Sequence, residues 1–266
     1  MGAQIKAILL DMDGVLYRGE SAISGAIEFM ARIQHLPHAF ITNNPILPAR
    51  AVADRLQRLG FQRPDHRQII TSAEATALWL FRQKNDFRYF AVGAEGLHSA
   101  LCEYGIEDRN TADFVVIGEG VGIDYEQIAI GVNLILQQGA HLICTNPDHS
   151  VDGYINGKHC VLPGGGALVA PFAVAAETDP IFIGKPHALL YQIALQRLEV
   201  DAEHCLMIGD RPDTDIAGAV ELNMQTALVR TGRFSPGTLI PDYLPTPDWD
   251  VDSLLSLLNE ISFDQK

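Results

Sequence analysis

Short apolar runs alternate with amphipathic stretches along the whole chain, and this alternation limits the fold more than any other feature. The predicted strands cover residues 7–10, 38–42, 88–92, 113–117, 141–144, 181–183, 205–209 and 226–229. The predicted helices cover residues 22–34, 47–59, 74–83, 96–103, 125–137, 188–198 and 213–222. Strands that alternate with helices in this way predict an α/β fold, in which a parallel sheet is covered by helices on both faces.

Polar residues follow three of the predicted strands directly. Asp11, Thr42 and Asp210 each stand at or just past the end of an apolar run. Ligands of open α/β sheets bind at the carboxyl ends of the strands. The sequence therefore predicts that these three residues converge on one site.

The first strand leads into Asp11-Met12-Asp13-Gly14. Residues two apart in an extended chain point the same way, so Asp11 and Asp13 share one face. One carboxylate of such a pair can act as a nucleophile and the other as a general acid and base. Gly14 permits a tight departure from the strand. Taken alone, however, the motif is explained as well by an Asp-rich turn or a helix cap.

Two further motifs are typical of anion binding. In Thr42-Asn43-Asn44, a hydroxyl and the backbone N–H groups that follow it could form a small phosphate cradle. Gly184-Lys185-Pro186 brings Lys185 to the entrance of a predicted helix, where positive potential favours anions. The alternatives are a simple loop after a strand and a surface lysine.

The segment Gly209-Asp210-Arg211-Pro212-Asp213-Thr214-Asp215 places three carboxylates within six residues. Carboxylate oxygens are the ligands that Mg²⁺ prefers, and Asp210 at the strand end is the best candidate. We expect Asp213 to cap the following helix. Asp215 is expected not to bind the metal itself but to orient the metal's ligands or water.

The order of these motifs resembles the haloacid dehalogenase (HAD) superfamily. About 140 residues separate Thr42 from Lys185, which leaves room for an inserted α/β cap domain. The segments Thr145-Asn146-Pro147-Asp148 and Pro163-Gly164-Gly165-Gly166 resemble the NagD-like, 4-nitrophenylphosphatase-type subfamily (subfamily IIA). The resemblance implies a Rossmann-like, doubly wound catalytic core over residues 1–74 and 180–266, with a cap over residues 75–179.

The resemblance also implies a magnesium-dependent phosphatase that forms an aspartyl-phosphate on Asp11, with Asp13 as general acid and base. Mg²⁺ would be held by Asp11, the backbone carbonyl of Asp13 and Asp210. Thr42 and Lys185 would bind the phosphoryl group, together with the backbone after Thr42. A carboxylate with an ordinary pKa near 4 is ionised at neutral pH, so Asp11 is expected to need no base.

The cap is expected to select the leaving group of a small phosphorylated metabolite. Asp148 and His149 are candidates to contact it, although a polar surface turn explains them equally well. Residues 163–166 could bind an anion before a helix, or could pack a loop closely against that helix. Related proteins often dimerise through the cap, which implies a homodimer.

The net charge of −14 and the lack of a basic run argue against nucleic-acid partners and against anionic membranes. The first apolar run is too short for a signal peptide, and the cysteines at 102, 144, 160 and 205 are too far apart for a CxxC pair. We therefore expect a cytoplasmic protein with buried free thiols. Two other functions stay open: a phosphotransferase or mutase with the same intermediate, and a binding or regulatory protein that uses the fold without turnover.

Overall fold

The computed structural model describes residues 4–62, 64–120, 122–155, 158–261 and 263. The chain forms two compact units. The first comprises Met1–Thr42, Arg50–Ile70 and Lys185–Lys266, and the second comprises Asn43–Ala49 and Thr71–Gly184. Each unit has its own sheet and its own core, as expected for an α/β domain that carries an inserted α/β domain.

Within the described residues, the first unit contains a six-stranded sheet in the order β15-β14-β13-β1-β4-β5. The pairs β1–β13, β1–β4, β13–β14 and β14–β15 are parallel. The strands are β1 (Ala7–Leu10), β4 (His38–Thr42), β5 (Ile69–Thr71), β13 (Cys205–Gly209), β14 (Gln225–Val229) and β15 (Trp249–Val251). All four residues of β1 and all five of β13 are buried, as expected for central strands covered on both faces.

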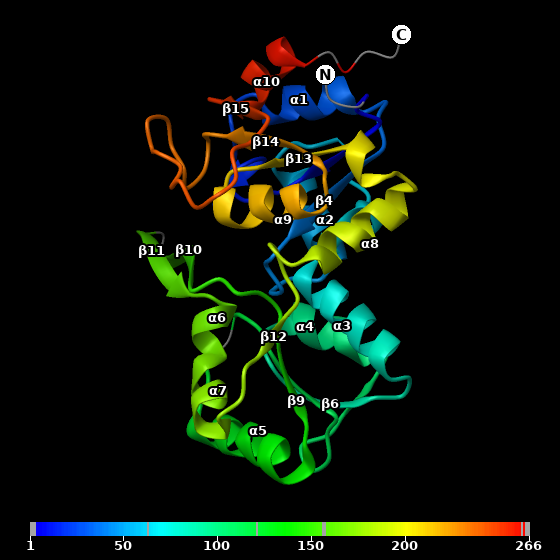
Figure 1. The fold of residues 1–266 in the computed structure, drawn as a ribbon, viewed down its shortest axis with the longest axis vertical. Helices are drawn as coiled ribbons and strands as arrows, with labels where there is room; N and C mark the ends of the chain where they lie inside the picture. The colour runs from blue at the N-terminus through cyan, green and yellow to red at the C-terminus, as the bar shows by residue number, and fades with distance from the viewer. Residues whose placement is uncertain (1–3, 63, 121, 156–157, 262, 264–266) are drawn as a thin grey trace. The chain divides into compact units, whose positions relative to one another are not determined.

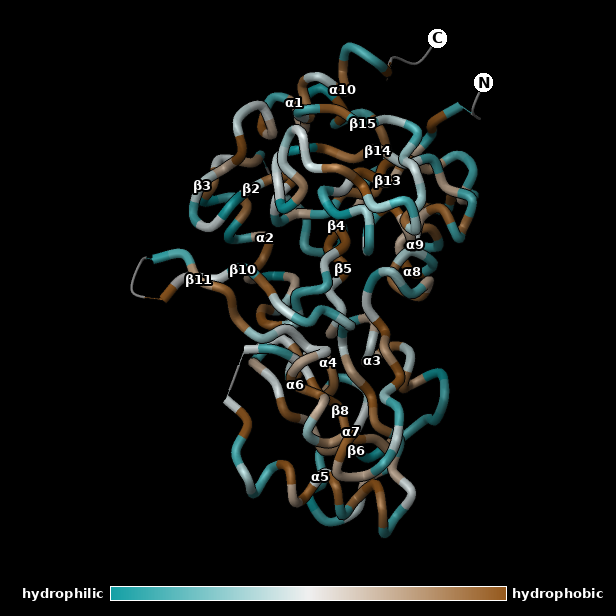
Figure 2. Tube along the Cα trace, turned by 60° about the vertical axis from the view of Figure 1, so that its left-hand side comes forward, coloured by the Kyte–Doolittle hydropathy of each residue, from teal (hydrophilic) through white to brown (hydrophobic). Residues whose placement is uncertain are grey.

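Helices cover both faces of this sheet. They are α1 (Ala26–Ile33), α2 (Ala49–Arg58), α8 (Ala188–Leu198), α9 (Ala217–Glu221) and α10 (Leu254–Glu260). Figure 1 shows α1 and α10 together on one face, and α8 and α9 on the other. In Figure 2 the strands β13 and β14 are mostly hydrophobic, whereas the helices carry both colours. A doubly wound α/β core is therefore confirmed.

Within the described residues of the second unit, a five-stranded sheet has the order β12-β9-β8-β6-β7. Its strands are β6 (Arg88–Val92), β7 (Ile106–Glu107), β8 (Phe114–Ile117), β9 (His141–Cys144) and β12 (Ile181–Phe182), and every pair is parallel. Alternate residues of β6, β8 and β9 join one apolar core with side chains such as Leu134 and Phe172. The residues between them point to the opposite face and are buried as well, so these three strands are covered on both faces.

The helices of the second unit are α3 (Ser72–Gln83), α4 (Glu95–Cys102), α5 (Tyr125–Gln138), α6 (Gly165–Leu168) and α7 (Ala170–Ala176). Figure 1 shows α5 beside α7, and α3 beside α4. Strands β10 (Ser150–Ile155) and β11 (Lys158–Pro163) pair antiparallel as a hairpin. A shorter antiparallel pair, β2 (Tyr17–Arg18) and β3 (Ser21–Ala22), belongs to the first unit.

Most of the predicted elements are present within a residue or two, while several short ones escaped prediction. The expected helix at 213–222 is instead one π-helical turn, Pro212–Ile216, followed by α9. The four cysteines, all within the described residues, are free thiols as expected, but only Cys144 and Cys205 are buried, whereas Cys160 is half-buried and Cys102 is exposed. Among the described residues, none of the helices has the length and apolar character needed to cross a membrane.

Candidate active site

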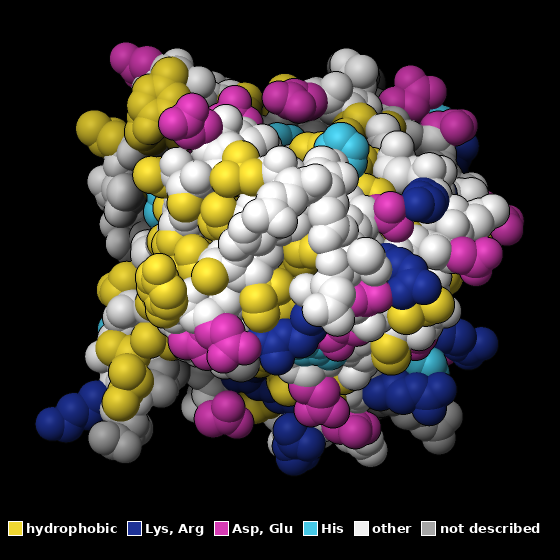
Figure 3. Space-filling view, turned by 90° about the horizontal axis from the view of Figure 1, so that it is seen from below, with side chains coloured by type: hydrophobic (Ala, Val, Ile, Leu, Met, Phe, Trp, Pro, Cys, Tyr) yellow, Lys and Arg dark blue, Asp and Glu magenta, His cyan; other side chains and the backbone are white. Residues whose placement is uncertain are grey.

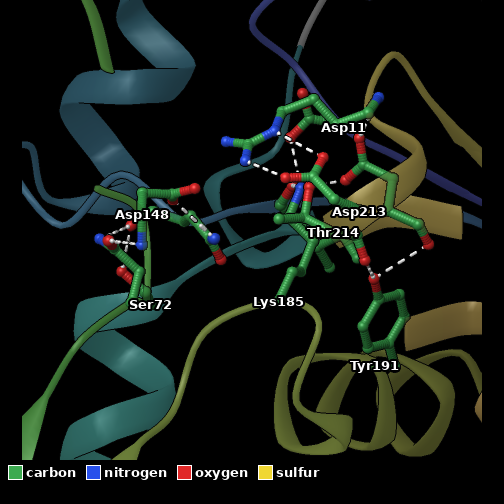
Figure 4. A network of polar contacts seen from close by, with 12 residues as sticks. Asp11, Ser72, Asp148, Lys185, Tyr191, Asp213 and Thr214 are labelled. Carbon is green, nitrogen blue, oxygen red and sulfur yellow. Dashed lines mark hydrogen bonds and ion pairs between the residues drawn. The ribbon is translucent and has the colours of Figure 1, made fainter. Parts of the chain in front are cut away.

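Asp11 and Lys185 form a buried ion pair at the carboxyl edge of the first unit's sheet. Leu10 pairs with Ile208, and the Asp11 N–H donates to the Ile208 carbonyl at 2.9 Å, so Asp11 directly follows a central strand. The Lys185 ammonium donates to Asp11 Oδ1 at 2.5 Å, to Asp215 Oδ1 at 2.7 Å and to the Ile41 carbonyl at 3.3 Å. These contacts use the three donors of an ammonium group. Figure 4 shows Lys185 pointing at Asp11.

Carboxylates outnumber the cation at this place. Within the described residues, Asp11, Asp210 and Asp215 meet around Lys185, and all four are buried. Burial raises the pKa of Asp11 to about 7, an effect that the Lys185 ammonium partly opposes. Burial, and then repulsion by Asp215 and Asp11, raise the pKa of Asp210 well above its ordinary value. Burial of these side chains thus works against the expected ionisation of Asp11.

The same set of residues fits a divalent cation. One carboxylate oxygen from each of Asp11, Asp210 and Asp215 lies within 4.8 Å of the other two. With all three ionised, one ammonium group leaves two negative charges without a counter-charge. Hard cations such as Mg²⁺ take carboxylate oxygens, and a cation here would favour the ionised forms. The donor set and the excess charge thus both suit Mg²⁺.

Asp13 occupies a different environment from Asp11. The chain turns sharply after Met12, whose carbonyl accepts from the Leu16 N–H at 2.8 Å, and Gly14 adopts a φ of 85° in this turn. Asp13 is exposed, whereas Asp11 is 8% exposed. Two carboxyl groups separated by one residue therefore have different access to solvent, as a nucleophile and a general acid and base require.

The π-helical turn holds Asp215 in place. The Asp215 carboxylate accepts from the Arg211 N–H at 3.1 Å and from Lys185. Tyr191 on α8 donates through its hydroxyl to the carbonyls of Thr214 and Asp215, as Figure 4 shows. Asp213 was expected to cap a helix, and this is wrong, because its carboxylate pairs with the Arg211 guanidinium at 2.7 Å.

The residues of the predicted phosphate cradle are divided between the units. Thr42 is the last residue of β4 and is buried in the first unit. Asn43 and Asn44 follow it in the second unit. The Asn43 amide donates to Asp148 Oδ2 at 2.8 Å, and Asn44 Oδ1 accepts from the Ile46 N–H. The Asn43 side chain therefore joins two segments that are distant in sequence, whereas the Asn44 side chain fixes a local turn.

A second polar cluster lies inside the second unit. Glu119 follows β8 and Asn146 follows β9, and both are buried. The Asn146 amide donates to Glu119 Oε1 at 2.7 Å and to the Asn43 carbonyl at 2.9 Å, and Ser72 donates to the same carbonyl. Burial raises the pKa of Glu119 to about 7, against the hydrogen bond from Asn146. Figure 4 shows the Ser72 and Asp148 part of this cluster.

The two loops that sequence analysis left open have distinct environments. His149 is exposed, whereas Asp148 is buried and bonded to Asn43. The glycines of residues 163–166 pack tightly, since a Cβ on Gly164 would lie 2.2 Å from the Asp148 carbonyl oxygen. The Gly165 N–H donates to Glu119. The close packing of loop against helix is therefore confirmed for this segment.

Sequence reasoning missed Tyr191, Glu119 and the turn that follows β14. That turn, Thr231–Arg233, comes two residues after an apolar run. Its position after a strand is the same signal that identified Thr42 and Asp210, and it could have been applied here. Tyr191 lies within an ordinary amphipathic helix and carries no such signal.

The fold and the motifs agree with comparisons to known proteins. A family model described as haloacid dehalogenase-like hydrolase matches residues 8–107, and a second HAD-like hydrolase model matches residues 182–257. The 5'-nucleotidase YutF of Bacillus subtilis (strain 168) is 34% identical over 253 residues, which cover 94% of this chain and 96% of that protein.

Two further relatives extend the comparison. An acid sugar phosphatase of Staphylococcus aureus (strain USA300) is 35% identical over 234 residues, which cover 86% of this chain and 88% of that protein. The solved structure of NagD from E. coli K-12 superposes with a TM-score of 0.83 at 29% identity, over 95% of this chain and 98% of that chain. The chain therefore belongs to the haloacid dehalogenase-like hydrolases, in the NagD-like group that forms subfamily IIA.

Proposed function

We propose that this chain hydrolyses small phosphate monoesters with the help of Mg²⁺, through an aspartyl-phosphate on Asp11. Its relatives carry the names of phosphatases and of a 5'-nucleotidase, and the chain is a phosphoric monoester hydrolase of the same family. The observation that carries the mechanism is the buried Asp11 at the end of a central strand, 2.5 Å from Lys185 and beside two further carboxylates.

In the first half of the reaction, Asp11 attacks the phosphorus atom and the bond to the leaving alkoxide breaks. Lys185 holds Oδ1 of Asp11, so we assign the attack to Oδ2. Asp13, which is exposed, donates a proton to the leaving oxygen. In the second half, Asp13 takes a proton from the water that attacks phosphorus. Phosphate then departs and the Asp11 carboxylate is restored.

Repulsion between Asp11 and a phosphate dianion is the main obstacle to this chemistry. Two like charges 4 Å apart cost about 4 kcal/mol at an effective dielectric constant of 20. Asp11, the backbone carbonyl of Asp13 and Asp210 would hold Mg²⁺, which when bound neutralises charge on the phosphoryl oxygens. Asp215 keeps Lys185 and the 211–215 turn in place beside these ligands.

We assign phosphoryl binding to Thr42, to the backbone that follows it at Asn43 and Asn44, and to Lys185. The three donors of the Lys185 ammonium already meet Asp11, Asp215 and a carbonyl. Its contribution to phosphoryl binding is therefore mainly its positive charge. Burial lowers the pKa of Lys185, but Asp11 and Asp215 raise that pKa more strongly, so Lys185 stays protonated.

The substrate is a small phosphorylated metabolite such as a sugar phosphate or a nucleotide, and the second unit acts as the cap that selects it. His149 and Asp148 are the proposed contacts. We also propose a cytoplasmic homodimer formed through this unit. Figure 3 shows hydrophobic side chains gathered toward the left of one face, and Val174 and Leu136 of the second unit are 77% and 62% exposed.

The test is hydrolysis of 4-nitrophenyl phosphate with added Mg²⁺, with free phosphate measured in the absence of any acceptor. The wild-type chain should release phosphate, and EDTA should stop it. Asp11→Asn and Asp13→Asn should each abolish turnover, while circular dichroism shows that the fold is retained. Turnover that needs an added acceptor would point to a phosphotransferase, and full activity in either variant would overturn the assignment.

A further inference from the structure

The turn after β14 encloses the carboxylate of Asp210, and none of its residues belongs to the motifs that identified the site. We propose that Thr231, Gly232 and Arg233 are positioning residues that set the place of the Asp210 carboxylate for metal binding. The inference rests on the proposed role of Asp210 as a Mg²⁺ ligand. Gly232 is the most important of the three, because its lack of a side chain leaves room for the Asp210 carboxylate.

Two glycines leave the space in which Asp210 lies. A Cβ on Gly232 would stand 1.7 Å from Asp210 Oδ2, 2.3 Å from its Cγ and 2.6 Å from its Cβ. A Cβ on Gly14 would stand 2.6 Å from the same Oδ2. Because even the Cβ of Asp210 is within 2.6 Å, no rotamer of Asp210 relieves the first clash, and the backbone itself would have to move.

Hydrogen bonds join this turn both to Asp210 and to the loop that follows Asp11. The Arg233 N–H donates to Asp210 Oδ2 at 2.8 Å. The Thr231 hydroxyl donates to the Gly14 carbonyl at 2.6 Å, and the Arg18 guanidinium donates to the Thr231 carbonyl at 2.5 Å. The turn thus ties the Asp210 carboxylate to the loop that follows Asp11, and both acids are candidate ligands of one ion.

Such an arrangement fixes one oxygen of a short, buried side chain. Asp has only two side-chain torsions, and Asp210 is 3% exposed, so a single strong donor at Oδ2 determines where its other oxygen points. Groups that orient metal ligands in this way typically account for about 10- to 100-fold in metal affinity. Gly232 permits the donor, because any larger residue would displace the acceptor.

The experiment compares Mg²⁺ binding by isothermal titration calorimetry in the wild-type chain and in Gly232→Ala. Gly122→Ala is the matched control, since a Cβ there meets nothing within 4 Å. We expect Gly232→Ala to bind Mg²⁺ about tenfold or more weakly, with an unchanged circular dichroism spectrum. Its turnover of 4-nitrophenyl phosphate should recover as Mg²⁺ is raised, whereas a purely structural defect would not respond to the ion. Gly122→Ala should match the wild type.

Thr231→Val provides an independent test if Gly232→Ala does not fold. It keeps the side-chain shape and removes the hydroxyl donor to Gly14. Loss of one hydrogen bond of about 1 kcal/mol should weaken Mg²⁺ binding about fivefold. Wild-type Mg²⁺ affinity in either folded variant would overturn the positioning role. A wild-type chain that binds no Mg²⁺ would instead overturn the proposed function itself, together with this inference.

Discussion

Replacing Glu119 with Gln should change how the stability of the second unit depends on pH. Glu119 is 2% exposed, and burial raises its pKa from an ordinary value of 4.5 to about 7. Because the folded-state pKa is the higher one, the stabilising contribution is full below pH 4.5 and is lost as the pH rises through 7. At about 1.4 kcal/mol per pKa unit, the whole change corresponds to about 3 kcal/mol.

Gln does not titrate, and its Oε1 can still accept from Asn146 and from the Gly165 N–H. Between pH 5.5 and 8.5, the wild type should therefore lose about 2 kcal/mol relative to Glu119→Gln. Any constant effect of the new amide cancels in this difference. The lower pH stays above the pI of about 4.9, where the protein carries least net charge.

Urea unfolding followed by tryptophan fluorescence provides the assay. The chain has two tryptophans, Trp79 in the second unit and Trp249 in the first, so a Trp249→Phe background makes the signal specific to the second unit. Glu103→Gln, at an exposed position in the same unit, controls for the loss of one negative charge. Parallel stability curves for Glu119→Gln and the wild type over this pH range would refute the reasoning.

Three further predictions concern the first unit. Lys185→Met should abolish phosphate release. It should also lower the free energy of unfolding of the unit by about 3–5 kcal/mol, because Asp11 and Asp215 would stay buried without their cation. An unchanged urea unfolding curve would contradict this. Tyr191→Phe should cost about 1 kcal/mol, since its hydroxyl serves the carbonyls of Thr214 and Asp215, and an unaltered urea midpoint would show that these bonds contribute nothing. Mg²⁺ affinity should fall about tenfold from pH 8 to pH 6, because Asp11 has a pKa of about 7 and the ion must compete with a proton for its carboxylate. An affinity that calorimetry finds independent of pH would exclude that competition.

Local patterns were sufficient to predict which strand ends meet. Asp11 and Asp210 follow strands that pair in parallel, and residues at the carboxyl ends of such strands must share an edge. The alternation of short apolar runs with helices carries this information directly. The convergence of Asp11 and Asp210, two of the three strand-end residues expected to meet, could therefore be predicted from the sequence. Lys185 was expected at a helix entrance, and that local pattern did not show that it pairs with Asp11.

Contacts between residues that are distant in sequence could not be predicted from local patterns. Asn43 is bonded to Asp148, which lies 105 residues away, and nothing in either local sequence identifies the partner. Asp213 has the composition of a helix cap, yet the neighbouring Arg211 provides a better partner. The raised pKa of Asp11 depends on how completely the fold buries it, which composition does not reveal.

The most direct test of the central claim is to trap the phosphate on Asp11. An Asp13→Asn variant, which lacks the general base, should accumulate the intermediate with 4-nitrophenyl phosphate and Mg²⁺. Acid quenching followed by borohydride reduction converts an aspartyl-phosphate to homoserine, which peptide mass spectrometry locates. We predict homoserine at position 11, and only with substrate present. Homoserine at another aspartate, or wild-type turnover with no trapped residue in either protein, would contradict the assignment of Asp11 as the nucleophile.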